Sequence, residues 1–214
     1  MESKMIKIYP RNNQSVPLKI IPGHFATNHS HINTYIDMTT LKTRQSDALA
    51  VAKMLVEQYV HTTIVDTIIC LEGTQVIGAM LAEELTRAGF FSRNAHKSIY
   101  VVTPEQNSNT SQLIFRDNLK NMVTNRNIIV LEPSITTGYT TLKVLEMVRY
   151  YGGILQGISA IFSVPDKIGG IPINALFSKK DLPSYQTYDY TECPFCKNGI
   201  PIDALVNGYG YSKL

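Results

Sequence analysis

The feature that most constrains the fold is a short apolar run that leads into a turn rich in threonine and glycine. Residues 128–131 read Ile-Ile-Val-Leu, which is typical of a strand buried on both faces of a sheet. A helix is expected from Thr140 to Tyr151, ended by Gly152 and Gly153. This order of strand, turn and helix gathers backbone N–H groups that lack intrahelical partners at the positive end of the helix dipole.

The turn between this strand and this helix has the composition of a phosphate-binding loop. Threonine hydroxyls add hydrogen-bond donors, and Gly138 permits a positive φ or a close approach of the backbone to an oxygen. The turn is neither a Walker loop nor a dinucleotide fingerprint, because both glycine patterns are absent. The alternative is a plain helix cap. The candidate loop residues are Ser134, Ile135, Thr136, Thr137, Gly138, Tyr139 and Thr140.

The rest of the chain alternates helical and strand patterns, which favours an α/β fold with a mostly parallel sheet flanked by helices. One domain is expected over residues 1–214, with an N-terminal hood at 20–40 that is antiparallel or looped rather than core, and an irregular tail at 185–214. The polar segment Glu105–Gln112 predicts a mobile loop. The other predicted elements are helices Thr43–Tyr59 and Val76–Ala88, strands Thr63–Leu71, Ser98–Thr103 and Leu155–Val164, and one edge strand near Tyr185–Tyr190.

Composition argues against nucleic acid or membrane as the main partner. The net charge is 20 − 17 = +3, without a run of basic residues. No apolar stretch approaches the roughly 20 residues that span a bilayer, and Met1–Pro10 lacks the apolar core of a signal peptide. Three cysteines are too few for a disulfide framework. A cytoplasmic protein is therefore expected.

The tail contains one Cys-x-x-Cys pair, Cys193 and Cys196. Such turns point two thiolates at one metal ion, for which Zn²⁺ is the candidate. A closed structural site needs four ligands, and Cys70 lies far away in a buried type of strand. The other two ligands would come from histidines or from a second subunit. A redox pair and a plain tight turn are the alternatives.

Residues 128–140 resemble the motif with which type I phosphoribosyltransferases bind 5-phosphoribosyl 1-pyrophosphate (PRPP). In that motif an apolar strand, two acidic residues and a threonine-rich loop follow one another, and Gly152 and Gly157 stand where the family has glycines. Near the N-terminus, Gly23-His24-Phe25 with Tyr35-Ile36-Asp37 resembles the opening hood segment of the orotate-specific members. The resemblance covers roughly residues 20 to 165.

The resemblance implies a homodimeric enzyme that transfers phosphoribosyl from PRPP to orotate with Mg²⁺, in pyrimidine nucleotide synthesis. Displacement of pyrophosphate requires a held 5′-phosphate, carboxylates on the ribose diol and metal, and cations on the leaving group. Glu132 would be the catalytic carboxylate; its alternative is a solvated residue at a strand end. The implied pyrophosphate loop is Glu72, Gly73 and Thr74, and the implied base side is Phe25, Asn28 and Lys167.

Several positions depart from the family pattern. Pro133 replaces the second acidic residue, residues 70–76 contain no Lys or Arg, and no cation lies between Ile99 and Phe115. The hood histidines His29 and His31 are interpreted as solvated. The sequence leaves three functions open: a phosphoribosyltransferase, a catalytically degenerate PRPP- or nucleotide-binding regulatory protein of the same fold, and a metal-stabilised interaction domain governed by the tail.

Overall fold

A computed structural model describes residues 4–10, 15–87, 92–95, 97–107 and 112–214. Its contacts group into two compact units, each described here by itself: a core unit, Leu41–Ser178, and a split unit, Met1–Thr40 with Lys179–Leu214. The single domain expected over residues 1–214 stays a prediction. Over the described ranges, no helix combines the length and the apolar character that crossing a membrane requires.

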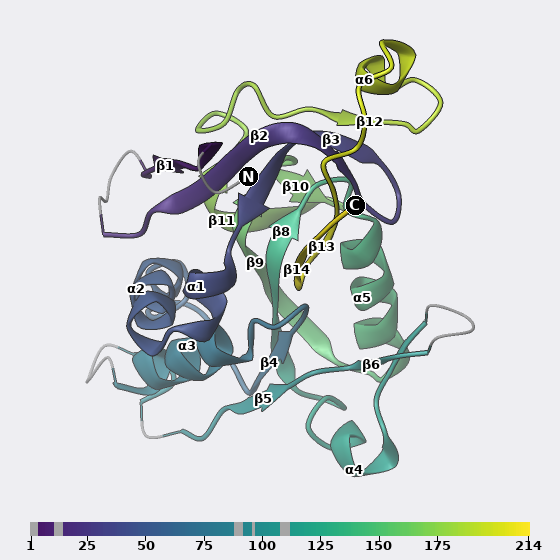
Figure 1. The fold of residues 1–214 in the computed structure, drawn as a ribbon. Coiled ribbons are helices and arrows are strands. Elements are labelled where there is room, and N and C mark those ends of the chain that lie inside the picture. Colours follow the sequence, from purple (N-terminus) through teal and green to yellow (C-terminus); the bar gives the residue numbers. More distant parts are fainter. Residues whose placement is uncertain (1–3, 11–14, 88–91, 96, 108–111) are drawn as a thin grey trace. The chain divides into compact units, whose positions relative to one another are not determined.

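The core unit is built on a sheet that has, within the described residues, the strand order β10-β11-β9-β8-β4-β5 (Figure 1). All neighbouring strands are parallel except β10 and β11, which are antiparallel. The predicted α/β fold with a mostly parallel sheet is therefore confirmed. The strands are β4 (Thr67–Cys70), β5 (Tyr100–Val102), β8 (Asn127–Ile135), β9 (Ile154–Ser163), β10 (Lys167–Ile168) and β11 (Ile171–Ser178).

Helices cover both faces of this sheet. Figure 1 shows α2 (Gln45–Val56) and α3 (Gln75–Arg87) on one face and α5 (Tyr139–Tyr150) on the other. Successive strand residues point to opposite faces. On the α3 face a Cβ at Gly78 would lie 2.3 Å from the Sγ of Cys70, so helix and strand approach closely. On the α5 face the core contains Ile69, Leu71, Ile128, Val130, Val144, Met147 and Val148.

The three long helices predicted from the sequence correspond to α2, α3 and α5, with ends that differ by a few residues. The predicted end of the second helix, at 88–89, lies outside the described residues. Strand β8 runs on to Ile135, so Ser134 and Ile135 belong to the strand and not to the turn. Proline has no N–H to donate to a neighbouring strand. Pro133 is tolerated inside β8 because the pairing of β4 with β8 ends at Leu131, so no β4 residue needs a hydrogen bond from position 133.

The segment predicted as a mobile loop, Glu105–Gln112, is part of a small ribbon. Glu105–Gln106 (β6) pairs antiparallel with Leu113–Ile114 (β7), so the loop prediction is wrong at its beginning. Residues 108–111 lie outside the described residues. A one-turn helix, α4 (Asp117–Lys120), follows the ribbon. A short α1 (Thr39–Thr43) precedes α2.

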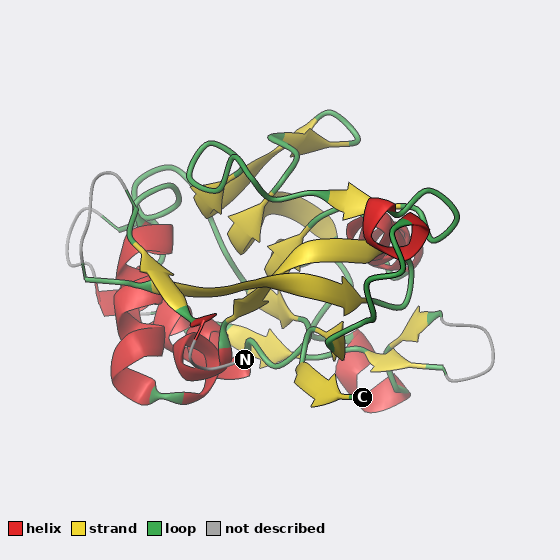
Figure 2. Cartoon of the chain, turned by 45° about the horizontal axis from the view of Figure 1, so that its top comes forward, coloured by secondary structure: helices red, strands yellow, loops and turns green. Residues whose placement is uncertain are grey.

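The split unit is a second sheet, with the order β12-β3-β2-β13-β14 and β1 paired to β2 among the residues described (Figure 2, strands in yellow). The β2–β13 pair is parallel and the others are antiparallel. Its elements are β1 (Ile6–Ile8), β2 (Leu18–Ala26), β3 (His31–Asp37), β12 (Thr187–Tyr188), α6 (Pro194–Lys197), β13 (Ala204–Asn207) and β14 (Gly210–Lys213).

This sheet confirms the antiparallel hood and corrects the expectation that the hood contributes no core residues. The hood is the antiparallel pair β2–β3, and Leu18, Ile21 and Phe25 are fully buried. The predicted edge strand near Tyr185–Tyr190 is confirmed as β12, which pairs with β3. The rest of the tail is more regular than its sequence indicates, because β13 gains its pairing from β2, far away along the chain.

Candidate phosphate and pyrophosphate site

The candidate site lies where the strand order of the core sheet reverses. From the neighbouring strands β4 and β8, the chain continues outward to β5 on one side and to β9 and β11 on the other. The helix after β4 covers one face and the helix after β8 covers the opposite face (Figure 1). Ligands of open α/β sheets bind outside the carboxyl ends of the two strands at such a reversal. Here those ends lead into residues 71–74 and 136–138.

The turn after β8 presents the N-terminus of α5 without a capping side chain. Gly138 is the N-cap residue of α5, with φ 77° and ψ 5°, and no side chain accepts a hydrogen bond as a cap. The N–H of Tyr139 makes a long contact with the Oγ1 of Thr137, at 3.5 Å. The N–H groups of the first helical turn are therefore disposed to bind an anion.

Glycine is required at position 138 for two separate reasons. The positive φ is unfavourable for a residue with a side chain. A Cβ at this position would also lie 2.5 Å from the Cδ1 of Ile168 in β10. The missing side chain would point at Ile168, so a larger residue would displace the turn against β10.

The predicted loop residues differ in what they can offer a ligand. Ile135 is buried and pairs with Ser163 of β9, which leaves its backbone as the only part near the turn. Thr137 and Tyr139 are exposed. Ser134, Thr136 and Thr140 are half-buried.

The turn after β4 has an unusual backbone. Glu72 and Gly73 both have positive φ, 46° and 84°, and a left-handed glutamate is uncommon outside strained or functional turns. Burial raises the pKa of Glu72, and the charge of Lys42 opposes this rise. Thr74 is fully buried, and its hydroxyl donates to the carbonyls of Leu71 (2.9 Å) and Leu131 (3.1 Å). Thr74 thereby connects the residue that follows β4 to Leu131 in the middle of β8.

A lysine that the sequence analysis missed lies against this turn. Lys42 of α1 is 6% exposed, and its Nζ donates to the backbone oxygen of Glu72 at 3.0 Å. A Cβ at Gly73 would be 3.7 Å from the same Nζ. The turn thus has a cation, although none lies within residues 70–76. Thirty residues separate Lys42 from Glu72, so no local pattern indicates the contact.

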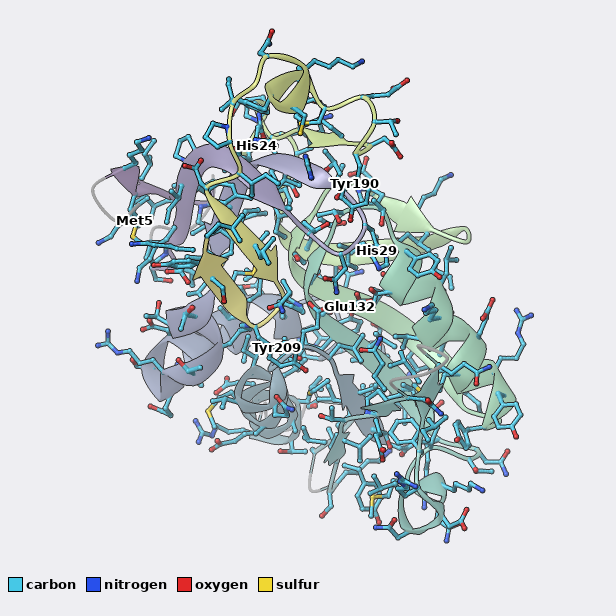
Figure 3. All side chains as sticks on the ribbon, turned by 45° about the vertical axis from the view of Figure 1, so that its right-hand side comes forward. Met5, His24, His29, Glu132, Tyr190 and Tyr209 are labelled. Carbon is cyan, nitrogen blue, oxygen red and sulfur yellow. The ribbon has the colours of Figure 1, made fainter. Side chains whose placement is uncertain are left out.

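Glu132 is a buried acid within β8, three residues before the strand ends at Ile135 (Figure 3). It is 3% exposed, and its Oε1 has no hydrogen-bond partner among the described residues. Burial raises the pKa of Glu132 to about 8; the Thr141 hydroxyl lowers it and the charge of Glu72 raises it. The Oγ1 of Thr141 likewise has no hydrogen-bond partner in the described structure. Glu132 is therefore mostly protonated at neutral pH and can donate as well as accept a hydrogen bond.

The residues predicted for the base side are spread over both units. Phe25 is fully buried beside Tyr35 in the split unit, so it can act on a ligand only by fixing the β2–β3 ribbon. Asn28 is exposed in the turn between these strands. Lys167 is exposed at the start of β10, next to the residue that packs on Gly138. Contact of these residues with a base stays a prediction.

The cysteines of the tail do not form an isolated pair. Cys193 and Cys196 lie with His24 and His31, all within the split unit. The interpretation of His31 as solvated is wrong, because it is 7% exposed and packed beside His24. His29 is exposed, as predicted. The spacing of the cysteines indicated half of this cluster, but no pattern linked the histidines of β2 and β3 to it.

Sequence comparisons relate part of the chain to orotate phosphoribosyltransferases. The chain is 36% identical over 77 residues to the protein named orotate phosphoribosyltransferase from Caldanaerobacter subterraneus. The aligned residues make up 35% of this chain and 38% of that relative. The chain is 35% identical over 81 residues to the Thermotoga maritima protein, and the alignment covers 36% of this chain and 40% of that relative. The matched region thus spans about two fifths of these relatives' lengths. No protein-family model matches the chain.

Solved structures share the fold over most of the chain. Orotate phosphoribosyltransferase from Aeropyrum pernix has a TM-score of 0.54 at 20% identity, covering 77% of this chain and 91% of its own. The Mycobacterium tuberculosis orotate phosphoribosyltransferase in complex with PRPP has a TM-score of 0.51 at 13% identity, covering 69% of this chain and 82% of its own. Adenine phosphoribosyltransferase from Thermoanaerobacter pseudethanolicus has 0.51 at 15%, covering 83% and 96%. The fold is therefore that of type I phosphoribosyltransferases.

Proposed function

We propose that this protein is a phosphoribosyltransferase that binds PRPP at the carboxyl ends of β4 and β8. The observation that carries the proposal is the uncapped N-terminus of α5 at Gly138, placed at the reversal of the sheet beside the buried Glu132. The similarity to proteins named orotate phosphoribosyltransferase supports it, and so does the structural neighbour that holds PRPP.

Each part of the donor has a matching group in the core unit. The 5′-phosphate is assigned to the N–H groups and hydroxyls of residues 136–140, where an anion also gains from the helix dipole. The ribose diol is assigned to Glu132, whose protonated carboxyl can donate to one hydroxyl and accept from the other. The pyrophosphate is assigned to the turn at Gly73, beside Lys42.

The described residues do not fit a Mg²⁺ ion held by the protein at this strand end. Magnesium prefers ionised carboxylates, whereas Glu132 is mostly protonated and the next residue is Pro133. A magnesium ion that enters with the substrate would be held by phosphate oxygens. The residues of this chain then contribute orientation, hydrogen bonds and the charge of Lys42.

Orotate is the proposed acceptor because the matched relatives carry that name. Lys167 of the core unit is proposed for its recognition, because it would supply a charge for the carboxylate of orotate. The role of Asn28 stays a prediction from the resemblance. The homodimer and the place in pyrimidine nucleotide synthesis stay predictions from the resemblance, and the cytoplasmic location stays a prediction from the sequence.

A second candidate, a PRPP- or nucleotide-binding protein without turnover, is favoured by one specific observation. Residues 99–115 contain no cation, and the adjacent Arg116 forms a two-pronged ion pair with Glu105, at 2.6 and 2.7 Å. Arg116 is thus engaged by a carboxylate at the base of the β6–β7 ribbon. Without a cation from this segment, the leaving pyrophosphate would lose transition-state stabilisation of several kcal/mol.

A turnover assay separates these candidates. The purified chain is mixed with PRPP, Mg²⁺ and orotate, and the absorbance of orotate and the released pyrophosphate are followed together. We expect the two to change in equal amounts. Saturable PRPP binding without loss of orotate would support the second candidate. Release of pyrophosphate with adenine in place of orotate would reassign the acceptor base.

Replacing Lys42 with methionine is expected to weaken PRPP binding by about 30-fold, because a buried charged hydrogen-bond donor beside the pyrophosphate is lost. Affinity for ribose 5-phosphate should stay within about twofold, since this ligand has no pyrophosphate. Isothermal titration calorimetry measures both. Lys53→Met, an exposed site on α2, is the matched control. Equal losses for both ligands would indicate general damage and contradict the assignment.

A further inference from the structure

We propose that the split unit contains a structural Zn²⁺ site whose four ligands are His24, His31, Cys193 and Cys196. This site is separate from the phosphate turn and does not depend on the proposed function. The histidines come from β2 and β3. Cys193 directly precedes α6 and Cys196 lies within it, 162 or more residues further along the chain than the histidines. Figure 3 shows His24 on its strand below the α6 turn.

The distances between the ligand atoms match a tetrahedral Cys₂His₂ site. All four ligand atoms lie within 4.8 Å of one another. The Nε2 of His24 is 3.0 Å from the Nδ1 of His31, and the Sγ of Cys196 is 3.3 Å from the same Nδ1. Ideal Zn–N and Zn–S bonds give edges of about 3.3 Å between two nitrogens and about 3.6 Å between nitrogen and sulfur.

The second contacts of His24 turn its Nε2 lone pair toward the cluster. Its Nδ1 faces the carbonyl oxygens of Ile200 (2.9 Å) and Pro201 (3.2 Å), so the neutral ring carries its proton on Nδ1. A metal-binding histidine usually donates its other N–H to a carbonyl or carboxylate in this way. The backbone of His24 is also fixed by Asp203. The N–H of His24 donates to the Asp203 carboxylate at 2.8 Å, and the carbonyl oxygen of His24 accepts from the backbone N–H of Asp203 at 2.7 Å.

Hydrogen bonds alone account poorly for this cluster. The single lone pair on Nε2 of His24 faces the Nδ1 of His31 at 3.0 Å, the Sγ of Cys193 at 3.4 Å and the Sγ of Cys196 at 3.7 Å. One lone pair can accept one strong hydrogen bond, whereas one cation satisfies all four groups. His24, His31 and Cys193 are buried, and buried polar groups without partners are costly.

The donor set selects the metal. Two sulfurs and two imidazole nitrogens in tetrahedral array favour Zn²⁺ over Mg²⁺ or Ca²⁺, which prefer oxygen ligands. The Cys-x-x-Cys turn provides the usual geometry: Cys193 precedes the one-turn helix α6, Cys196 lies within it, and the turn closes at Gly199 with φ 68°. The ion would join the tail to β2 and β3. The tail elements in this region, β12 and α6, are short.

The full-length chain, purified with zinc and without strong chelators, tests the site by metal analysis and by cobalt substitution. We expect one zinc per chain, and a Co²⁺ form with the intense visible bands and thiolate charge-transfer bands of a tetrahedral S₂N₂ site. Removal of the metal should lower the midpoint of thermal unfolding by roughly 5–10 °C. These readouts do not depend on catalysis.

Paired variants localise the ligands. His31→Asn should lose the metal and the cobalt bands, whereas His29→Asn, an exposed histidine of the same ribbon, should keep both. Wild-type protein that binds no stoichiometric zinc, or His31→Asn that retains it, would overturn the proposal. An alkylation experiment that finds Cys193 and Cys196 joined in a disulfide in the native protein would also overturn it, in favour of a redox pair. The wild-type cobalt spectrum decides the outcome if His31→Asn does not fold.

Discussion

Gly138→Val is expected to weaken the binding of ribose 5-phosphate by about 100-fold or more, which corresponds to losing one or two charge-assisted hydrogen bonds. The added Cβ would meet Ile168 at 2.5 Å while φ is 77°, so the turn has to move. Calorimetric titration of the folded variant measures the effect. Unchanged affinity would show that residues 134–140 are not the phosphate loop.

Two further variants separate local strain from damage to the fold. Gly170→Val places a side chain at an equally left-handed residue, φ 83°, where no atom lies within 4 Å of the new Cβ. It should keep the affinity for ribose 5-phosphate. The double variant Gly138→Ala/Ile168→Ala removes the obstructing side chain and should bind more tightly than Gly138→Ala alone. Failure of this rescue would mean that Ile168 does not determine the position of the turn.

Glu132→Gln is expected to remove a large pH dependence of stability. In the folded protein burial raises the pKa of Glu132 to about 8 from an ordinary value of 4.5, so the folded state holds a proton that the unfolded state releases. This contribution to stability is complete below pH 4.5 and is lost as pH rises toward 8. The loss is on the order of 4 kcal/mol. The glutamine variant should therefore be the more stable protein at pH 8.

Urea unfolding at several pH values between 5 and 8.5 measures this difference. The wild-type free energy of unfolding should fall across the range, and the Glu132→Gln curve should be flatter. Glu146→Gln, an exposed site on α5, is the control and should follow the wild-type curve. Parallel curves for wild type and Glu132→Gln would show that Glu132 is ionised in the folded protein, which would remove the basis for its assigned contact with the ribose diol.

The parts of the fold that the sequence predicted are those with strong local patterns. The buried strand at 128–131 and the helix after it appear as β8 and α5, because apolar runs and helical periodicity are local signals. Strand β11 was missed, since Ile171–Ser178 contains Pro172 and Asn174 and is stabilised by its pairing with β9. The hood was underestimated for a similar reason: its strands β2 and β3 pair with the tail strands β13 and β12, which lie far away along the chain.

The candidate site shows the same division. The phosphate turn and Glu132 follow one another along the chain, so their spacing was visible in the sequence. Lys42 of α1 contacts the backbone of Glu72 in the turn after β4. A lone lysine beside threonines gives no signal of burial in the sequence. Likewise, the Cys-x-x-Cys pair was visible, but its histidine neighbours are joined to it only by the pairing of β2 with β3 and the fold of the tail.

The central claim is that residues 134–140 bind the phosphate of a phosphoribosyl ligand. Calorimetric titration of the wild-type protein with PRPP in the presence of Mg²⁺ tests it most directly. We expect saturable binding at one site per chain, with competition by ribose 5-phosphate. Absence of binding by either ligand would contradict the claim and would mean that the threonine and glycine turn serves only to begin helix α5.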